Sequence, residues 1–113
     1  MEYRINPKNG DKLSILGYGC LRYTKKGAVI DQAKAEKEMA RAIALGVNYF
    51  DTAYVYRGSE ATLGKFLAKG YREQVYIATK LPHYLIKKPG DTETYFQEEL
   101  SRLQTNYVDY YLM

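Results

Sequence analysis

The stretch Val47-Asn48-Tyr49-Phe50-Asp51-Thr52-Ala53-Tyr54-Val55-Tyr56 decides the fold of this 113-residue chain. Its apolar beginning predicts a buried strand that ends on Asp51, and Tyr56 follows in the next loop. A second apolar run, residues 75–79, predicts another strand that ends on Lys80. In a sheet of parallel strands the carboxyl ends meet at one edge, where such folds carry their chemistry. We therefore expect Asp51, Tyr56 and Lys80 to lie together.

The chain upstream of this stretch begins with a predicted β-hairpin. Two strand-like runs, residues 3–5 and 13–15, flank Asn9-Gly10, the strongest short signal for a hairpin turn. The first strand of the main sheet is predicted over residues 16–20, and a polar, turn-like segment over residues 21–30 follows it.

Three helices are predicted between the strands, each with apolar residues on one face, and Asp31 and Ser59 are expected to cap the first two. They run from Asp31 to Gly46, from Ser59 to Gly70, and from Asp91 or Thr92 to Leu103. A fourth strand is predicted over residues 108–112, so a strand ends about every thirty residues along the chain.

A regular alternation of strand and helix builds either a doubly wound sheet or a (β/α) barrel. The first strand lacks the Gly-x-Gly-x-x-Gly motif of a Rossmann dinucleotide site. The hairpin and the even repeat favour a barrel, but a closed barrel needs eight units and about 250 residues. We therefore predict one α/β domain, the amino-terminal half of a (β/α)8 TIM barrel, with a hairpin over residues 1–15 and βα units over residues 16–113.

The composition narrows the class of protein. The net charge of +4 comes from scattered lysines, which favours small anionic partners weakly and nucleic acid hardly at all. A single cysteine excludes an internal disulfide and any cysteine-rich metal site. No signal peptide or long apolar run is present, so we expect a cytoplasmic protein with no membrane partner and no metal.

Asp51, Tyr56 and Lys80 each have an ordinary explanation when taken singly. An aspartate after a strand often caps a turn, a lysine there is usually solvated, and Tyr56 is one of thirteen tyrosines. Together they have a physical function. An ammonium beside a phenol favours the phenolate and lowers the pKa of the phenol, and a carboxylate keeps the ammonium charged and oriented. A phenol tuned in this way can donate a proton to a carbonyl oxygen.

Three separate stretches of the chain resemble the aldo-keto reductase family. They are the Gly-x-x-x-Phe-Asp-Thr-Ala-x-x-Tyr pattern of residues 46–56, Ser59-Glu60-x-x-Leu63-Gly64, and Thr79-Lys80-Leu81. The resemblance implies reduction of aldehydes and ketones by hydride transfer from NADPH, with Asp51, Tyr56 and Lys80 as catalytic residues. Residues 78–82 and 100–104 are also similar to a bacterial subgroup whose members often carry a carboxyl-terminal iron–sulfur extension.

The resemblance also places a cofactor site and a missing histidine. It implies that Gly19, Cys20 and Leu21 pass the nicotinamide, together with Asp51 and Tyr56. An alternative for Cys20 is a small buried thiol. The family's catalytic histidine follows a run like residues 108–113, one position beyond the last residue here, and the groups that grip the adenosine phosphate come mostly from later strands.

His83 cannot replace that histidine, because it follows Lys80 on another loop, and a place at the pocket mouth is its simpler interpretation. The expected function is therefore that of a fragment of an NADPH-dependent aldo-keto reductase, inactive alone and a weak cofactor binder. The alternative is a non-catalytic half-barrel that forms a homodimer or pairs with a complementary chain, because cut strand edges and an open core face demand cover.

Overall fold

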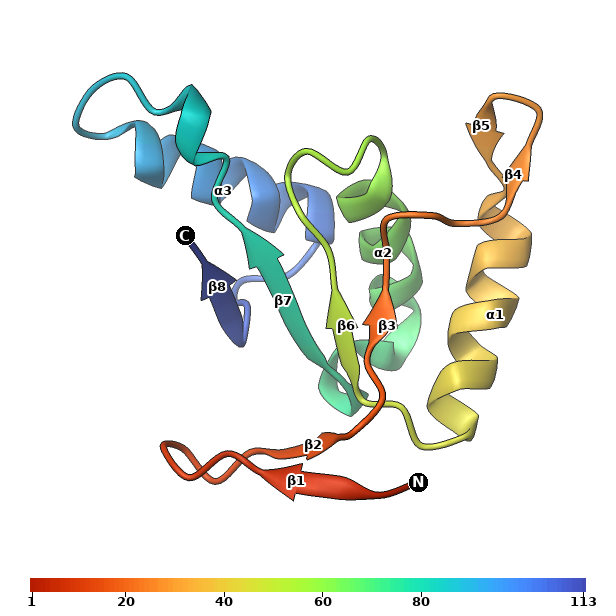
Figure 1. The fold of residues 1–113 in the computed structure, drawn as a ribbon. Helices are drawn as coiled ribbons and strands as arrows, with labels where there is room; N and C mark the ends of the chain where they lie inside the picture. The colour runs from red at the N-terminus through yellow and green to blue at the C-terminus, as the bar shows by residue number, and fades with distance from the viewer.

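The sheet at the centre of the fold contains four parallel strands in the order β3-β6-β7-β8, in a computed structural model that describes residues 1–113. The strands are short, and they are Tyr18–Gly19 (β3), Tyr49–Asp51 (β6), Tyr76–Lys80 (β7) and Tyr110–Leu112 (β8). Each parallel neighbour follows its predecessor in the chain, so every crossover spans one βα unit (Figure 1). The four predicted parallel strands are confirmed.

Three α-helices form the connections between these strands, as predicted. They are Gln32–Ala44 (α1), Ser59–Phe66 (α2) and Asp91–Leu103 (α3). A π-helical turn, Leu67–Tyr71, and a 3-10 turn, Arg72–Gln74, continue α2, and a 3-10 turn, His83–Leu85, follows β7. None of the helices has the length and apolar character needed to cross a lipid bilayer.

Helix ends show where local sequence sets the structure. The Asp31 side chain accepts a hydrogen bond from the Lys34 amide, which confirms it as the cap of α1. Ser59 is not the cap that the sequence suggested. Gly58 precedes α2 in a left-handed conformation, and Ser59 is the first helical residue, with its hydroxyl turned inward.

Two antiparallel hairpins flank the parallel sheet. The predicted one pairs Tyr3–Ile5 (β1) with Lys12–Ser14 (β2) and lies across the end of the sheet where the parallel strands begin (Figure 1). The second pairs Lys25–Lys26 (β4) with Val29–Ile30 (β5), within the segment expected to be only turn-like. Gly27, at a positive φ of 68°, makes its turn.

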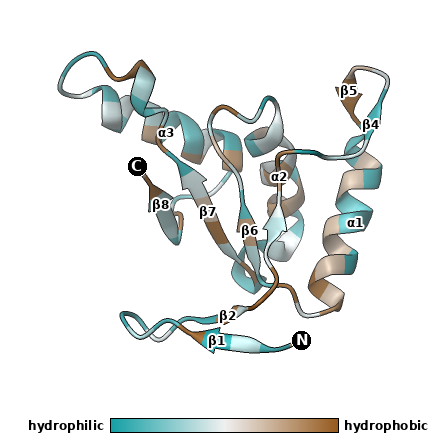
Figure 2. Cartoon of the chain, viewed as in Figure 1, coloured by the Kyte–Doolittle hydropathy of each residue, from teal (hydrophilic) through white to brown (hydrophobic).

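The core lies between one face of the sheet and the helices. Its centre consists of fully buried side chains from the strands and from α1, α2 and α3, among them Phe50, Ile77, Met39, Leu63, Phe66 and Leu103. The helices approach one another closely, since a Cβ atom on Gly64 of α2 would lie 2.1 Å from the Arg102 carbonyl oxygen of α3. Apolar residues also run along β7 and the link from β2 to β3 (brown in Figure 2).

The other face of the sheet has no helix over it. Side chains alternate along a strand, so Tyr49, Tyr76 and Tyr110 point away from Phe50 and Ile77. All three tyrosines are partly exposed, and the Tyr49 and Tyr110 rings contact each other with centroids 5.7 Å apart. This inner face is where a complete barrel would have its interior.

Candidate active site

The inner face of the sheet carries two charged residues at its carboxyl edge. Asp51 is the last residue of β6, and Lys80 is the last residue of β7. The strand register pairs Asp51 with Ala78, and Lys80 lies two positions after Ala78 on the same face. Two adjacent parallel strands of matched register therefore place the carboxylate and the ammonium side by side.

The Lys80 ammonium donates all three of its hydrogens within the protein. Its Nζ atom donates to Asp51 Oδ1 at 3.0 Å, to Asp51 Oδ2 at 2.8 Å and to the Thr52 carbonyl oxygen at 2.9 Å. The same Nζ lies 4.8 Å from the centre of the Tyr56 ring. The structure thus brings Asp51, Tyr56 and Lys80 together, as the strand pattern predicts, whereas their catalytic roles stay predictions.

The electrostatics of this group favour a charged lysine. Burial by itself lowers the pKa of Lys80, but the hydrogen bonds and charge of Asp51, together with the nearby Tyr56 side chain, raise the Lys80 pKa overall. The Lys80 and Asp51 side chains are 31% and 33% exposed, so a small molecule can reach the pair.

The loops that carry the site are tied to one another by buried hydroxyl groups. The Ser59 hydroxyl donates to the Cys20 carbonyl oxygen at 2.7 Å, and the Thr52 and Ser59 hydroxyls lie 2.7 Å apart. The Cys20 amide in turn donates to the Asp51 carbonyl oxygen at 2.8 Å. The segments after β3 and β6 are thereby fixed to the start of α2, which holds Asp51 and Thr52 in place for Lys80.

The predicted cofactor residues of the first strand lie beside this group but differ in exposure. Gly19 is exposed and pairs with Asp51, and Leu21 is 55% exposed. The Cys20 side chain is fully buried in the core, and burial raises the pKa of its thiol to about 12. A contact between Cys20 and a cofactor would therefore involve its backbone, and the role of the three residues stays a prediction.

A cavity of about 400 Å³ opens next to Tyr56 and Lys80. Its lining is mostly apolar and contains Ala53, Val55, Leu81, Pro82, Tyr84, Leu112 and Met113, together with His83. His83 thus lies at the pocket, as expected. A cavity of this size, with apolar walls and a few polar groups, is typical of a small-molecule site. Among the side chains with titratable groups that a ligand in this cavity would meet are Tyr56, Lys80 and His83.

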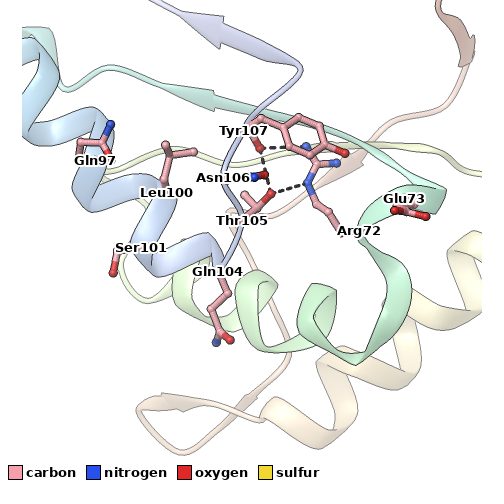
Figure 3. A pocket seen from close by; sticks show the side chains of 9 residues that line it. All are labelled: Arg72, Glu73, Gln97, Leu100, Ser101, Gln104, Thr105, Asn106 and Tyr107. Atoms are coloured by element: carbon pink, nitrogen blue, oxygen red, sulfur yellow. Dashed lines mark hydrogen bonds between the residues drawn. The ribbon is translucent and has the colours of Figure 1, made fainter.

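A larger cavity, of about 770 Å³, lies at the opposite end of the sheet and has a different character. It is lined by Arg72, Glu73, Gln97, Leu100, Ser101, Gln104, Thr105, Asn106 and Tyr107 (Figure 3). Its one buried cation, Arg72, donates to Thr105, Val75, Tyr107 and Asp109 and is thereby fully engaged in holding the chain before β8. No group of three or more His, Cys, Asp or Glu side chains could hold a metal ion.

Comparison with known proteins assigns this architecture to a family. Residues 15–113 match the model of the aldo/keto reductase family. An aldo-keto reductase of Mycobacterium sp. (strain MCS) is 32% identical over 111 residues, which cover 96% of this chain and 36% of the relative. Protein tas of Escherichia coli is 29% identical over 98% of this chain and 37% of its own length.

Solved structures agree with the sequence relatives. A Pseudomonas aeruginosa protein described as an aldo-keto reductase superposes with a TM-score of 0.83 at 28% identity, over 97% of this chain and 46% of its own. A silkworm aldo-keto reductase complexed with NADPH gives a TM-score of 0.74 at 28% identity, over 98% and 35%. The chain spans less than half the length of these relatives, and its fold is a partial TIM barrel. The chain belongs to the aldo/keto reductase family.

Proposed function

We propose that this chain supplies the proton-donating half of an NADPH-dependent carbonyl reductase, with Tyr56 as the proton donor to aldehydes and ketones. The observation that carries the proposal is the contact of one ammonium with both Asp51 and Tyr56 beside a cavity of about 400 Å³. NADPH is the cofactor expected for the family, and one relative was solved with it.

Each residue of the group has a distinct part in the proposed reaction. The cofactor, when bound, supplies a hydride to the carbonyl carbon. The Tyr56 hydroxyl gives its proton to the carbonyl oxygen, which becomes the alcohol, so that hydride and proton together complete the reduction. The Lys80 ammonium stabilises the phenolate that is left on Tyr56. Asp51 accepts two hydrogen bonds from Lys80 and so keeps it charged and aimed.

We propose further that the 113 residues alone bind NADPH weakly and reduce no carbonyl compound. The chain covers 36–37% of the length of the two sequence relatives. The cavity at Tyr56 and Lys80 has room for the nicotinamide end, but no cluster of cations beside it would hold the phosphates. The rest of the affinity would come from a carboxyl-terminal half. The iron–sulfur extension of the bacterial subgroup stays a prediction.

The uncovered inner face favours a second candidate, a half-barrel that functions through association. Tyr49, Tyr76 and Tyr110 are partly exposed on this face, and Leu112 at the sheet edge is 42% exposed. β3 and β8 each have one unpaired side. A second copy, or a complementary half-barrel as another chain, would cover both features.

An NADPH titration followed by fluorescence, with the mass of the same sample measured by light scattering, tests these proposals. Weak binding by the isolated chain and no NADPH oxidation with an aldehyde are expected. A chimera that continues residues 1–113 into the carboxyl-terminal part of the Mycobacterium relative should bind tightly and turn over. Turnover by the isolated chain would refute its inactivity, an inactive but folded chimera would refute the enzymatic role, and a monomeric mass with a cooperative melt would refute association.

A further inference from the structure

A second polar cluster lies on the outer face of β7, directly behind the candidate active site. It consists of Glu60 of α2, Thr79 of β7, Glu99 of α3 and Tyr111 of β8. Glu99 and Thr79 are fully buried, and Glu60 is 2% exposed. Because side chains alternate along β7, Thr79 points toward the helices and Lys80 points toward the inner face. The proposed reaction uses none of these buried groups, and two acids without water around them need an explanation.

The hydroxyl of Thr79 lies between the two acids. Its Oγ1 atom is 2.7 Å from Glu60 Oε2 and 3.0 Å from Glu99 Oε2. A hydroxyl has one hydrogen, so it donates to one of these oxygens and must accept a hydrogen from the other. A carboxylate has no hydrogen to give. If both acids were ionised, one of the two contacts would have no hydrogen between its oxygen atoms. One additional proton, held by either acid, gives both contacts a hydrogen.

The surroundings decide which acid holds the proton. Arg102 donates to Glu60 Oε1 at 3.3 Å, so Glu60 has a cation to offset its charge. Glu99 has no cation against it, and the Tyr111 hydroxyl donates to its Oε1 atom. Burial and, next, the neighbouring Glu60 together raise the pKa of Glu99 to about 8, against a smaller lowering by the hydrogen bonds of Tyr111 and Thr79. The neutral acid is Glu99.

We propose that Glu99 is a positioning residue, a neutral buried acid that anchors Thr79 and thereby the end of β7 from which Lys80 reaches Asp51. The hydrogen bonds then run in one direction, from Tyr111 to Glu99, from Glu99 to Thr79, and from Thr79 to the ionised Glu60. The effect on Lys80 rests on the proposed function of Tyr56 and Lys80, whereas the shared proton does not.

The proposal predicts that the stability of the folded chain decreases as the pH rises toward 8. The charged and titratable groups that face Glu99 are Glu60 from α2 and Tyr111 from β8, whereas Arg102 of α3 bonds to Glu60 and to Glu98. The folded state keeps a proton on Glu99 that the unfolded chain releases above about pH 4.3. The stability that this proton gives is therefore complete at low pH and is lost as the pH rises toward 8. Above that, two carboxylates face one hydroxyl.

The test is a carboxyl ¹³C NMR titration of glutamate-labelled protein, with urea unfolding of the wild type, Glu99→Gln and Glu60→Gln from pH 5 to pH 9. We expect one buried glutamate, assigned as Glu99 by its loss in Glu99→Gln, to titrate several pH units above the exposed glutamates. Glu99→Gln should fold as well as the wild type at pH 8 and lose the decline in urea midpoint, because an amide donates to Thr79 and accepts from Tyr111 as the neutral acid does. Glu60→Gln should be weaker at every pH.

A titration of Glu99 with the exposed glutamates would overturn the proposal, and so would a larger loss in Glu99→Gln than in Glu60→Gln. If Glu60→Gln does not fold, the wild-type titration decides alone. The positioning effect is measured separately, through the ¹³Cε chemical shift of Lys80. This shift should change with the Glu99 titration in the wild type and should not change over the same pH range in Glu99→Gln. A resonance that ignores Glu99 refutes the positioning role. An inactive chimera with both titrations as expected would refute only the proposed function.

Discussion

The two ends of the parallel sheet carry the same three kinds of residue, a cation, an aspartate and a tyrosine ring beneath the cation. At the carboxyl edge Lys80 pairs with Asp51 and lies 4.8 Å from the centre of the Tyr56 ring. At the amino end Arg72 pairs with Asp109, and its guanidinium carbon lies 3.9 Å from the centre of the Tyr107 ring. From residue types alone, the two clusters would be equally good candidates for the active site.

Their partners distinguish them. Arg72 donates to the backbone carbonyls of Val75 and Tyr107, and Asp109 accepts from both Arg72 and the Ile77 amide. These bonds tie the turn after α2 to the segment before β8, and the two charged side chains are only 13% and 18% exposed. Lys80 and Asp51 are about a third exposed beside an apolar cavity. The enclosed Arg72 cluster holds the fold, whereas the Lys80 cluster is accessible to solvent and has a phenol at a cavity that a ligand can enter.

The largest expected difference between the two clusters is in catalysis. In the chimera, Tyr56→Phe should lower the rate of carbonyl reduction by roughly 10²- to 10⁴-fold, because the phenol that donates the proton is gone. Tyr107→Phe is the matched control, since Arg72 uses the ring and the backbone carbonyl of Tyr107 and not its hydroxyl. NADPH oxidation measures both rates. Equal losses in the two variants would contradict the assignment of Tyr56.

The second difference between the clusters is in their contribution to folding stability, where the Arg72 cluster should matter more than the Lys80 cluster. Arg72→Met should lower the free energy of unfolding by about 3 kcal/mol, because it leaves a largely buried aspartate without its counter-charge and removes the donor to the Val75 carbonyl oxygen. Lys80→Met should cost at most about 1 kcal/mol, since its ion pair is partly solvated. Urea unfolding of both variants measures the contrast. A larger loss in Lys80→Met would mean that the open cluster is the structural one.

Substitution of the two aspartates should show the same difference in folding stability, with smaller losses. Asp109→Asn should lower the free energy of unfolding by roughly 1–2 kcal/mol, because an amide oxygen can still accept from Arg72 and the Ile77 amide but carries no charge to offset the largely buried guanidinium. Asp51→Asn should cost less than Asp109→Asn and should instead lower turnover in the chimera. Paired urea midpoints and NADPH oxidation rates check this, and a structural cost that is greater at Asp51 would reverse the interpretation.

The smallest expected effect is on the pH dependence of stability. Asp51 and Tyr56 raise the pKa of Lys80 overall, against the lowering by burial. The stabilisation from a raised lysine pKa is complete below the unfolded value of about 10.4 and is lost as the pH rises through the higher folded pKa. Wild-type protein should therefore lose more stability than Lys80→Met in urea between pH 9 and pH 11. Parallel curves would show that the Asp51–Lys80 contact adds nothing.

The sequence predicted most of what local pattern determines. Apolar runs located the parallel strands, and the shared carboxyl edge of those strands predicted that Asp51 lies near Lys80. The register that puts both side chains on one face is seen only in the structure. Asp31 was recognisable as a cap because capping needs only the next three residues. Ser59 has the same cap chemistry, yet its hydroxyl bonds to Cys20, which is distant in sequence, and no local signal reveals such a partner.

The buried ion and acid clusters were missed for the same reason. Arg72 reads as a solvated charge after a helix, because its partners at Thr105 and Asp109 lie more than thirty residues away. Glu99 had a usable signal, since it falls four positions before Leu103 on the helix face that also carries Phe96. A carboxylate on an apolar helix face predicts a buried polar partner, and here that partner is Thr79.

The most direct test of which cluster is the site is NMR mapping of reduced nicotinamide mononucleotide on ¹⁵N-labelled protein at millimolar concentration. This probe carries the part of NADPH that we propose binds in the cavity at Tyr56 and Lys80, so weak binding by the chain suffices. We expect amide shifts at residues 53–56, 80, 81 and 83, with none at residues 72 and 104–107. Shifts at the Arg72 end, or none near Tyr56 and Lys80, would contradict the assignment of the active site to the carboxyl edge of the sheet.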